Sequence, residues 1–500
     1  MRKQLLSLMF GVCLCGTVGA VDYTQGVFIV NEDYYGMNNS TINHLNPDDP
    51  DGNYWTYRVI QNENPGVELG CTSAHGAIHN GRFYIISKQD KDGGASVAGG
   101  RITIANVSDM KVLKQIRVID ESGETCDGRG FIGVDEKKGY VSTSNGVWVL
   151  DLEKMEITGQ VEGTENPYID DSYMCLYGGQ CGSMELVEGI VFVAHQSKGL
   201  LAIDPAQDKV VYTLSIAEAL KGHWSLTEEE SADIEAGTVK YDDCCPGIGS
   251  VVKDKNGKLW LSVAKGLNGM GVSMPFLICV DPATMQTKVA SLPSADEAPH
   301  NSWYAWTPDA FCASAVSDCL YWKSGVTMWF SGSKIYKYDI TTGVTTMIVD
   351  TNTPSEGNWQ VYGCSMRLHP LTDEIYVSLY KGFMDKSYVL RRYTTNGVKI
   401  QDYPMIQHYW FPSLPVFPTK ENVSSGVSSV YAQSSAVVNV VGNQLHVMNG
   451  TNEQCCVFDL SGRMVKSVVV TDSDFWTSLD VPAGIYVVTV KDTTFKVSVK

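Results

Sequence analysis

The chain has 500 residues, a length that suggests about three domains. Of these residues 44% are hydrophobic, which excludes an intrinsically disordered protein. Its formal net charge of -18 argues against binding to nucleic acid or to an anionic membrane surface, because no basic excess offsets the repulsion. Past the N-terminus, no segment has the roughly 18 continuous apolar residues that a membrane span needs.

Residues 1–20 have the pattern of a signal peptide. Arg2 and Lys3 give it a positively charged start, residues 5–15 are an apolar stretch, and residues 18–20 form a plausible cleavage site. The cysteines of this stretch follow valine and leucine, whereas lipoprotein processing requires a small residue before the cysteine. The sequence therefore predicts an exported protein, either secreted or held at the outer-membrane surface.

Residues 21–418 consist of short strand-like runs separated by turns, and a unit of four runs recurs. In residues 182–216 the runs are GSMELVEG, IVFVAHQ, LLAIDPAQDK and VVYTLSI, which we label A, B, C and D. Five more units have the same order, and ahead of them GVFIVNEDY, STINHLNPDD and YWTYRVI supply B, C and D runs without an A run. Repeated four-stranded units are typical of a β-propeller.

A propeller must close into a ring, and YWFPSLPVF, residues 409–417, is the segment left to supply the missing A strand. An A strand lies at the inner edge of its blade and pairs on one side, so it tolerates proline. The sequence thus predicts an all-β fold, with a seven-bladed β-propeller at residues 21–418 closed by a C-terminal strand. A β-sandwich or a pair of smaller β domains is the alternative.

The connections between these runs differ in length. The A–B and C–D turns are tight and share one face of a propeller, the short-turn face. The B–C and D–A connections share the other, the long-loop face; they are mostly long and rich in aromatic residues, so we expect only this face to enclose a pocket. Aromatic side chains there would contact a bulky planar or ring-shaped ligand. The expected ligand-binding residues are Trp303, Trp306, Trp410, Tyr35, Tyr177, Trp329 and Tyr380, with His195 and Lys265 as polar contacts.

Six cysteines recur where a D–A connection enters an A run: Cys71, Cys126, Cys181, Cys245, Cys312 and Cys364. We interpret them as small residues at a crowded axis, and disulfides between them stay open. Spacings typical of a metal or haem site are absent. His75 and Arg129 are placed near the same face, as polar anchors or as satisfied core-edge groups.

The motifs HExxH and GxSxG and a glycine-rich phosphate loop are absent, so we expect no catalytic residue, no metal and no cofactor. Asp170-Asp171 and Asp242-Asp243 are acidic pairs, but neighbouring carboxylates on a loop need not converge. Whether the protein is an enzyme stays open, with a non-enzymatic function favoured.

A serine-rich linker follows at residues 419–436, and residues 437–500 show the period-two alternation of a small β-sandwich, for which an additional Ig-like module would be the general explanation. The order VFDLSGRMV, LDVPAGIYVVTV and KVSVK resembles the C-terminal sorting domain of Bacteroidetes proteins secreted by the type IX system. The matching positions are Asp459, Leu460, Gly462, Arg463, Val465, Leu479, Pro482, Ala483, Gly484, Ile485, Tyr486, Lys496 and Lys500. The resemblance implies that the type IX secretion machinery reads this domain at the outer membrane.

The blade patterns LLAIDPAQDKVV and FLICVDPATMQTKV and the closing YWFPSLPVFP resemble YncE-like seven-bladed propellers. That group includes surface propellers of gut Bacteroidetes that capture corrinoids such as cobalamin. The resemblance implies a non-enzymatic binding protein for a corrinoid-like or glycan ligand. One alternative is a secreted propeller enzyme acting on polysaccharide, which would gather acid, base or metal-binding residues on the long-loop face. The other is a protein-binding adhesin, which would have a flatter face.

Overall fold

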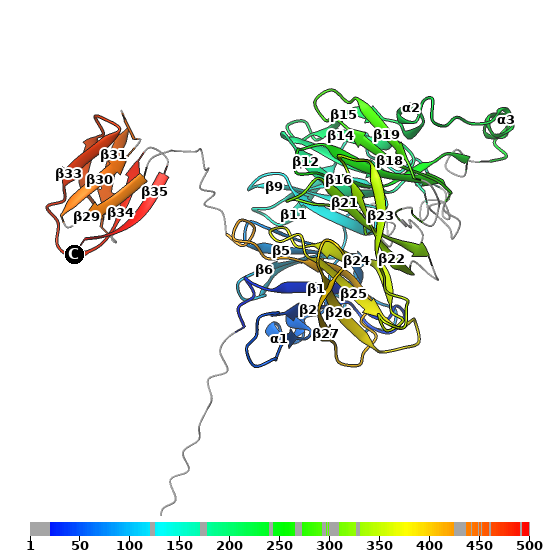
Figure 1. Ribbon diagram of the computed structural model, residues 1–500, viewed down its shortest axis with the longest axis horizontal. Helices are drawn as coiled ribbons and strands as arrows, with labels where there is room; N and C mark the ends of the chain where they lie inside the picture. The colour runs from blue at the N-terminus through cyan, green and yellow to red at the C-terminus, as the bar shows by residue number, and fades with distance from the viewer. Residues whose placement is uncertain are drawn as a thin grey trace, which may run out of the picture. The chain divides into compact units, whose positions relative to one another are not determined.

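The computed structural model divides the chain into two compact units, Met1–Val423 and Ser424–Lys500 (Figure 1). In the first unit it describes residues 21–120, 126–170, 178–239, 244–265, 273–292, 297, 299, 310–326 and 331–423. In the second it describes residues 424, 437–441, 443–448, 450–451, 453–459, 462–490 and 493–499. Among these residues, no helix has the length and apolar character to cross a membrane.

The described part of the first unit holds six antiparallel sheets. Their strands, sheet by sheet, are β28 (Pro412–Val416), β1 (Val27–Asn31), β2 (Thr41–Leu45) and β3 (Trp55–Thr56); β4 (Cys71–His79), β5 (Arg82–Gln89), β6 (Ile102–Asn106) and β7 (Val112–Ile116); β8 (Gly128–Gly133), β9 (Lys138–Thr143), β10 (Gly146–Asp151) and β11 (Glu156–Gln160); β12 (Cys181–Val187), β13 (Ile190–His195), β14 (Gly199–Asp204) and β15 (Lys209–Leu214); β16 (Gly247–Lys253), β17 (Leu259–Lys265), β18 (Ser273–Val280) and β19 (Thr287–Ser291); and finally β20 (Cys312–Ala313), β21 (Cys319–Val326), β22 (Ser331–Asp339), β23 (Val344–Asp350), β24 (Gln360–Leu368), β25 (Ile375–Tyr380), β26 (Tyr388–Tyr393) and β27 (Lys399–Pro404). The short helices α1 (Val59–Glu63), α2 (Ile216–Ala219) and α3 (Glu228–Glu235) lie in the connections.

The sheets follow one another around a ring. The last sheet has eight strands because Ser331 and Gly332 of β22 pair with Tyr362 and Val361 of β24, which joins two groups of four. The first strands of successive groups touch in the order β4, β8, β12, β16, β20, β24 and β28, and β28 touches β4 again. This is the arrangement of a β-propeller, and the prediction of an all-β propeller fold is confirmed.

The strands form where they do because the B and C runs are buried on both faces. Phe192 of β13 and Leu200 of β14 share one hydrophobic cluster with Leu261 of β17 and Ile278 of β18, so neighbouring sheets pack face to face. The outermost strand β15 has only one buried residue, which fits its more polar sequence. Each sheet therefore depends on its neighbours for its stability.

The proline-rich strand β28 is buried over its whole length and pairs antiparallel with β1. Leu414 lies opposite Val30 and Pro415 opposite Ile29, and the register shifts between Val30 and Asn31. The Ser413 hydroxyl donates to the carbonyls of Val30 (3.1 Å) and Ser73 (2.8 Å). A strand with β1 on one side can hold proline, because the missing N–H groups leave no partner unmatched on the other side.

Glu185 in β12 gives the unit an unusual pH dependence, since burial raises the pKa of its carboxyl from 4.5 to about 7. The unfolded chain loses this proton first, so the free energy of unfolding falls as the pH rises from about 4.5 to about 7 and stays lower above it. Over this interval of about 2.5 pH units, the free energy of unfolding falls by about 3 kcal/mol.

We therefore expect Glu185→Gln to raise the free energy of unfolding by up to about 3 kcal/mol at pH 8 and to leave it unchanged at pH 4, where the carboxyl is protonated in both states. Denaturant unfolding of both proteins at the two pH values measures this. An equal difference at pH 4 and pH 8 would contradict it.

The second unit consists of two sheets that share one core. Its strands are β29 (Val437–Val441), β30 (Gln444–Met448), β31 (Gln454–Phe458), β32 (Met464–Val469), β33 (Asp474–Ser478), β34 (Gly484–Val490) and β35 (Thr493–Val499). The sheet orders are β29-β30-β33 and β32-β31-β34-β35. Leu445 and Val447 of the first sheet cluster with Val457 and Val488 of the second, which is the packing of a β-sandwich.

Candidate functional site

Four charged side chains lie buried beneath the long-loop face, and we call them the polar floor. Glu32 directly follows β1, Lys88 lies near the end of β5, and Asp127 and Arg129 stand at the start of β8. Lys88 Nζ is 3.7 Å from Glu32 Oε1, and an Arg129 guanidinium nitrogen is 3.8 Å from Asp127 Oδ2. All four side chains are at most 8% exposed. The ends of three sheets thus bring two cations and two carboxylates together.

Hydrogen bonds tie the polar floor to neighbouring sheets. The Tyr362 hydroxyl of β24 donates to Glu32 Oε2 at 2.9 Å, and Arg129 Nε donates to Gln180 Oε1, ahead of β12, also at 2.9 Å. The Asp127 backbone N–H donates to the Ser144 hydroxyl at 2.9 Å. Ser144 belongs to the sheet of Asp127 itself, whereas Tyr362 and Gln180 belong to the neighbouring sheets, so the ring helps to hold these charges in position.

Burial works against the charged forms of Lys88, Asp127 and Arg129. It lowers the pKa of Lys88, which Glu32 counteracts, and it raises the pKa of Asp127, which Arg129 counteracts. The pKa of Arg129 falls to about 10 for the same reason. Desolvating an ion costs several kcal/mol even in a paired geometry, and apolar side chains would fill the same space at a lower cost. Such costly clusters concentrate at functional sites.

Aromatic side chains adjoin the polar floor, and we call them the aromatic wall. They are Tyr34, Tyr362, Tyr380, Phe383, Tyr388, Tyr409 and Phe411. Phe411 is central: its ring centroid lies 5.3 Å from that of Tyr362, 5.4 Å from that of Phe383 and 5.8 Å from that of Tyr34. Since Tyr362 also bonds Glu32, the wall and the floor form one continuous feature.

The structure places the predicted contact residues in three different situations. Tyr35, in the connection from β1 to β2, is 67% exposed on the long-loop face, as a ligand contact requires. Trp410 and Tyr380 are each 1% exposed. Trp410 stacks on Tyr57 with ring centroids 5.3 Å apart, and the Tyr380 hydroxyl is hydrogen-bonded to Ser331. Both rings are therefore packed against their own chain and are not open to a ligand. Tyr177, Trp303, Trp306 and Trp329 lie outside the described residues.

His195 is fully buried at the end of β13. Its Nε2 faces the Glu165 carbonyl at 3.4 Å, and its Nδ1 accepts from the backbone N–H groups of Ser197 and Lys198, both at 3.2 Å. Burial also lowers its pKa to about 3, so the ring is neutral. These contacts make His195 part of the β13–β14 turn and leave it no face toward a ligand.

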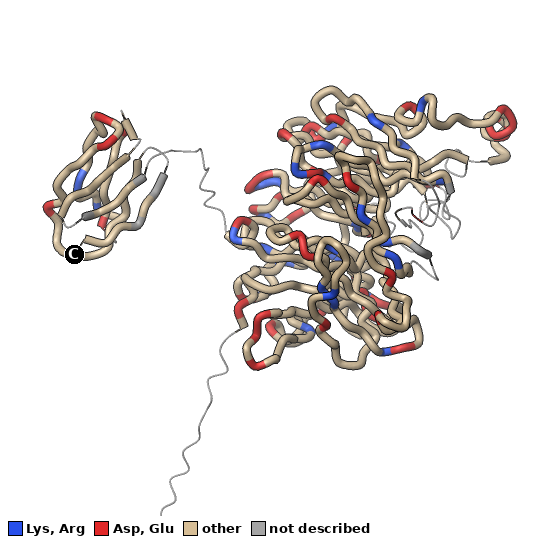
Figure 2. Tube along the Cα trace, viewed as in Figure 1, with Lys and Arg blue, Asp and Glu red and all other residues tan. Residues whose placement is uncertain are grey.

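Lys265, at the end of β17, forms an ion pair with Glu230 of α3, with Nζ and Oε1 2.7 Å apart. Helix α3 has no buried residue and is mostly acidic, as Figure 2 shows in red. Thr227 and Glu230 form a capping box at its N-terminus. Lys265 is therefore already engaged by its own chain, and a ligand would have to compete with Glu230.

Cys71, Cys126 and Cys181 are free thiols. Burial raises the pKa of Cys71 and of Cys126 to about 12, so both stay protonated. This favours the interpretation as small residues near the axis. Within the described residues, no three or more His, Cys, Asp or Glu side chains are grouped so that they could hold a metal ion.

The sequence reasoning missed three members of the polar floor. Glu32, Lys88 and Asp127 each stand where a hydrophobic run meets a connection, in VNED, SKQD and TCDGR. The available signal was the position of Glu32 and Lys88, since each places a charge at the corresponding point of a hydrophobic B run. Their pairing depends on which sheets are neighbours, and no local pattern reports that.

Comparison with known families and structures gives one strong match. A family described as "Domain of unknown function (DUF5074)" matches residues 25–228 and 231–418. A search of curated proteins found no match.

Solved structures similar to this chain share little sequence with it. A protein from Bacteroides uniformis, described there as a putative 6-phosphogluconolactonase, is 9% identical with a TM-score of 0.48, over 78% of this chain and 99% of that one. PorZ, a surface component of the type-IX secretion system of Porphyromonas gingivalis, is 12% identical with a TM-score of 0.41, over 98% of this chain and 61% of its own. The Cps50 (Swd1) β-propeller domain of Myceliophteria thermophila is 8% identical with a TM-score of 0.41, over 62% and 82%. Likeness at this level says nothing about function.

Proposed function

We propose that this chain, which belongs to the DUF5074 family, is an exported, non-enzymatic protein that binds a bulky ligand on the long-loop face. Residues 21–418 would be a seven-bladed propeller that β28 closes. The observation that carries the proposal is the junction of the polar floor and the aromatic wall at Tyr362, on the face with the long connections.

The chemistry of this feature fits a large ligand with a polar periphery. Aromatic side chains offer wide contact areas and lose little conformational entropy when a ligand orders them. Lys88 and Arg129 supply hydrogen-bond donors, and Glu32 and Asp127 supply acceptors. A corrinoid has an extended ring with amide groups around it, and a glycan has apolar sugar faces with hydroxyl groups around them. Both ligand classes therefore match the wall and the floor.

Isothermal titration with cyanocobalamin, and separately with soluble plant and mucin glycans, tests the proposal. Tyr35→Ala should weaken the binding of whichever probe binds by about thirtyfold, on the order of 2 kcal/mol, if Tyr35 stacks on it. Tyr212→Ala is the matched control, since Tyr212 is 41% exposed on the outer strand β15. Failure of every probe to bind, or an equal loss in both variants, would contradict the proposal.

A secreted enzyme acting on polysaccharide is the second candidate, because the floor holds Glu32 and Asp127, and burial raises the pKa of Asp127. If the protein releases reducing sugar from the same glycans and Asp127→Asn abolishes this activity, the protein is an enzyme and not a binding protein. Unchanged glycans with measurable binding would support the binding protein.

The second unit is proposed to be the type IX sorting domain. Asp459, Gly462 and Arg463 build the turn between β31 and β32: Gly462 has a φ of +82°, and Asp459 Oδ2 is 3.2 Å from Arg463 Nε. The Tyr486 hydroxyl donates to the Pro482 carbonyl at 2.9 Å ahead of β34. The matching residues thus make local contacts at two places, which supports their recognition by a receptor.

Deleting residues 439–500 in the native host should make the propeller accumulate in the periplasm. The propeller is a compact unit of its own, so this change leaves its packing intact. Fractionation followed by immunoblotting measures the distribution, with the full chain as the control. Normal arrival of the shortened protein at the surface or in the medium would show that the domain is not an address.

A further inference from the structure

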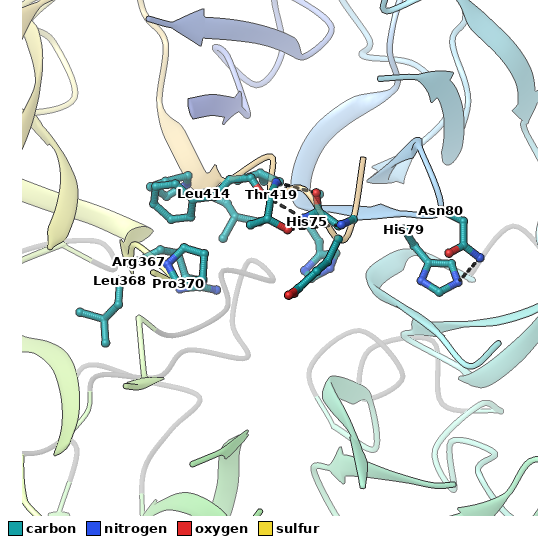
Figure 3. A pocket seen from close by; sticks show the side chains of 14 residues that line it. His75, His79, Asn80, Arg367, Leu368, Pro370, Leu414 and Thr419 are labelled. Atoms are coloured by element: carbon teal, nitrogen blue, oxygen red, sulfur yellow. Dashed lines mark hydrogen bonds between the residues drawn. The ribbon is translucent and has the colours of Figure 1, made fainter. Parts of the chain in front are cut away.

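A cavity lies on the short-turn face, where none was expected. Its volume is about 560 Å³, within the range of small-molecule sites. Three parts of the ring line it: the end of β4, the end of β24 with the following turn, and β28 with residues 417–422. In Figure 3, Arg367, Leu368 and Pro370 stand on one side, His79 and Asn80 on the other, and Leu414, Thr419 and His75 between them. We call it the short-turn pocket.

The expectation that only the long-loop face encloses a pocket is therefore wrong. The turns on this face are short, but the chain continues past β28, and residues 417–422 line one part of the cavity. His75 was also expected at the opposite end of the ring, yet it lines this pocket together with the β4–β5 turn.

Hydrogen bonds fix the position of residues 417–422 without a ligand. Thr419 N–H donates to Asn422 Oδ1 at 2.7 Å, and the Asn422 carbonyl accepts from Gly81 N–H, in the β4–β5 turn, at 2.8 Å. Asn422 Nδ2 donates to the Phe417 carbonyl at 3.0 Å. A preformed cavity spares a ligand the entropy cost of ordering the loops around it.

Two polar side chains of the short-turn pocket, His75 and Arg367, differ in charge. The Nε2 atom of His75 is buried and has no hydrogen-bond partner within the described residues. Burial, with Arg367 nearby, lowers the pKa of His75 to about 4, so the ring is neutral at pH 7. Arg367 lines the same cavity and always carries its charge. The His75 ring also hydrogen-bonds the Phe131 backbone carbonyl, and because Nε2 has no partner this bond comes from Nδ1, which leaves Nε2 of the neutral ring as an acceptor. A guanidinium beside an imidazole acceptor suits a ligand with an anionic group and a separate hydrogen-bond donor.

The remaining lining is largely apolar. Leu414, Pro415, Val416 and Phe417 supply it from β28 and the residue after it, and Leu368 and Pro370 supply it from the end of β24 and the turn that follows. The carboxylate of Glu421, also among the lining residues, is exposed. It disfavours ligands with several negative charges, because like charges repel over such distances.

We propose that the short-turn pocket binds a small organic molecule with one carboxylate and an apolar body. The carboxylate accepts hydrogen bonds from the Arg367 guanidinium, and the body packs against Leu414 and Phe417. A hydroxyl group on the body, where the ligand has one, donates to His75 Nε2. This site is separate from the ligand site proposed on the long-loop face and does not depend on it.

Benzoate and its neutral isostere benzamide are suitable probes, with binding followed by saturation-transfer NMR and titration calorimetry on the full chain. We expect benzoate to bind with a Kd of about 1 mM or tighter and benzamide at least about tenfold more weakly. Arg367→Gln should weaken benzoate binding about tenfold or more and bring it close to that of benzamide. His75→Phe, which keeps a ring and removes the Nε2 acceptor, should leave benzoate binding nearly unchanged, because benzoate has no hydrogen-bond donor.

Thermal unfolding of each variant shows whether it is folded. If Arg367→Gln or His75→Phe is unstable, Arg367→Lys is the alternative variant; because it keeps the charge, it should retain part of the affinity. Tyr35→Ala should leave benzoate binding unchanged, so this site and the long-loop site can fail separately. No benzoate binding at about 10 mM, or equal binding of benzamide, would overturn the proposal.

Discussion

A chain ending after Met405 is expected to lose its cooperative unfolding transition. The truncation removes β28 together with the rings that precede it, and four of the lost side chains are less than 8% exposed: Trp410, Phe411, Leu414 and Val416. Burying a side chain of this size contributes about 1.5–3 kcal/mol, so the four together contribute about 6–12 kcal/mol. That is comparable with the whole stability of a typical domain.

A chain ending after Ser424 is the matched control, because it also lacks the second unit but keeps β28. We expect its thermal transition to coincide with that of the propeller in the full chain. Circular dichroism and calorimetry measure both proteins. If the shorter chain unfolds cooperatively at the same temperature as the control, then β28 does not close the ring and the proposed seven-bladed architecture fails.

Arg391→Ala should lower the free energy of unfolding by about 3 kcal/mol or more. The Arg391 side chain is 2% exposed and lies 2.7 Å from Glu356 Oε2. It also pairs through two nitrogens with Asp402, at 2.8 Å for the NH2–Oδ2 contact. Removing one partner of a buried pair typically costs 3–5 kcal/mol because it leaves charges uncompensated, and here Glu356 and Asp402 keep some solvent contact. Denaturant unfolding measures the difference.

Arg117→Ala provides the control for the Arg391 measurement. Arg117 also contacts one carboxylate through two nitrogens, with NH2 2.7 Å from Asp90 Oδ2, but its side chain is 62% exposed. Exposed pairs are worth about 0.2–1 kcal/mol, so the loss should stay below about 1 kcal/mol. Equal losses in the two variants would mean that burial does not set the strength of these pairs.

The propeller fold could be predicted because each of its sheets has a recognisable local sequence pattern. Each unit repeats two hydrophobic runs and two tight turns, and a missing run in the first unit pointed to the proline-rich segment that contains β28. Proline narrows the possible positions in a sheet, which made this assignment specific.

The details of the site could not be predicted in the same way. Tyr34 and Tyr35 are neighbours in one connection, yet Tyr34 packs in the aromatic wall and Tyr35 is exposed. Trp410 was expected to face a ligand because of its residue type, but stacking on Tyr57 buries it. Residue type and loop membership show which face a side chain belongs to, whereas its orientation depends on contacts between distant segments.

The polar floor shows the same limit. Glu32 and Lys88 are far apart in the sequence and meet because β1 and β5 belong to adjacent sheets. The short-turn pocket likewise depends on where residues 417–422 turn after β28. A repeat predicts that units stack, but not which side chains of one unit reach those of the next.

Hydrogen–deuterium exchange with and without a bound probe tests the central claim most directly, because it locates the ligand without altering the protein. The probe is cyanocobalamin or the glycan that binds in the titrations. We expect slower exchange in the long-loop connections at residues 33–40, 90–99 and 381–387, and no change in the turns at residues 205–208 and 394–398. Protection confined to those turns, with the long-loop connections unaffected, would contradict the account.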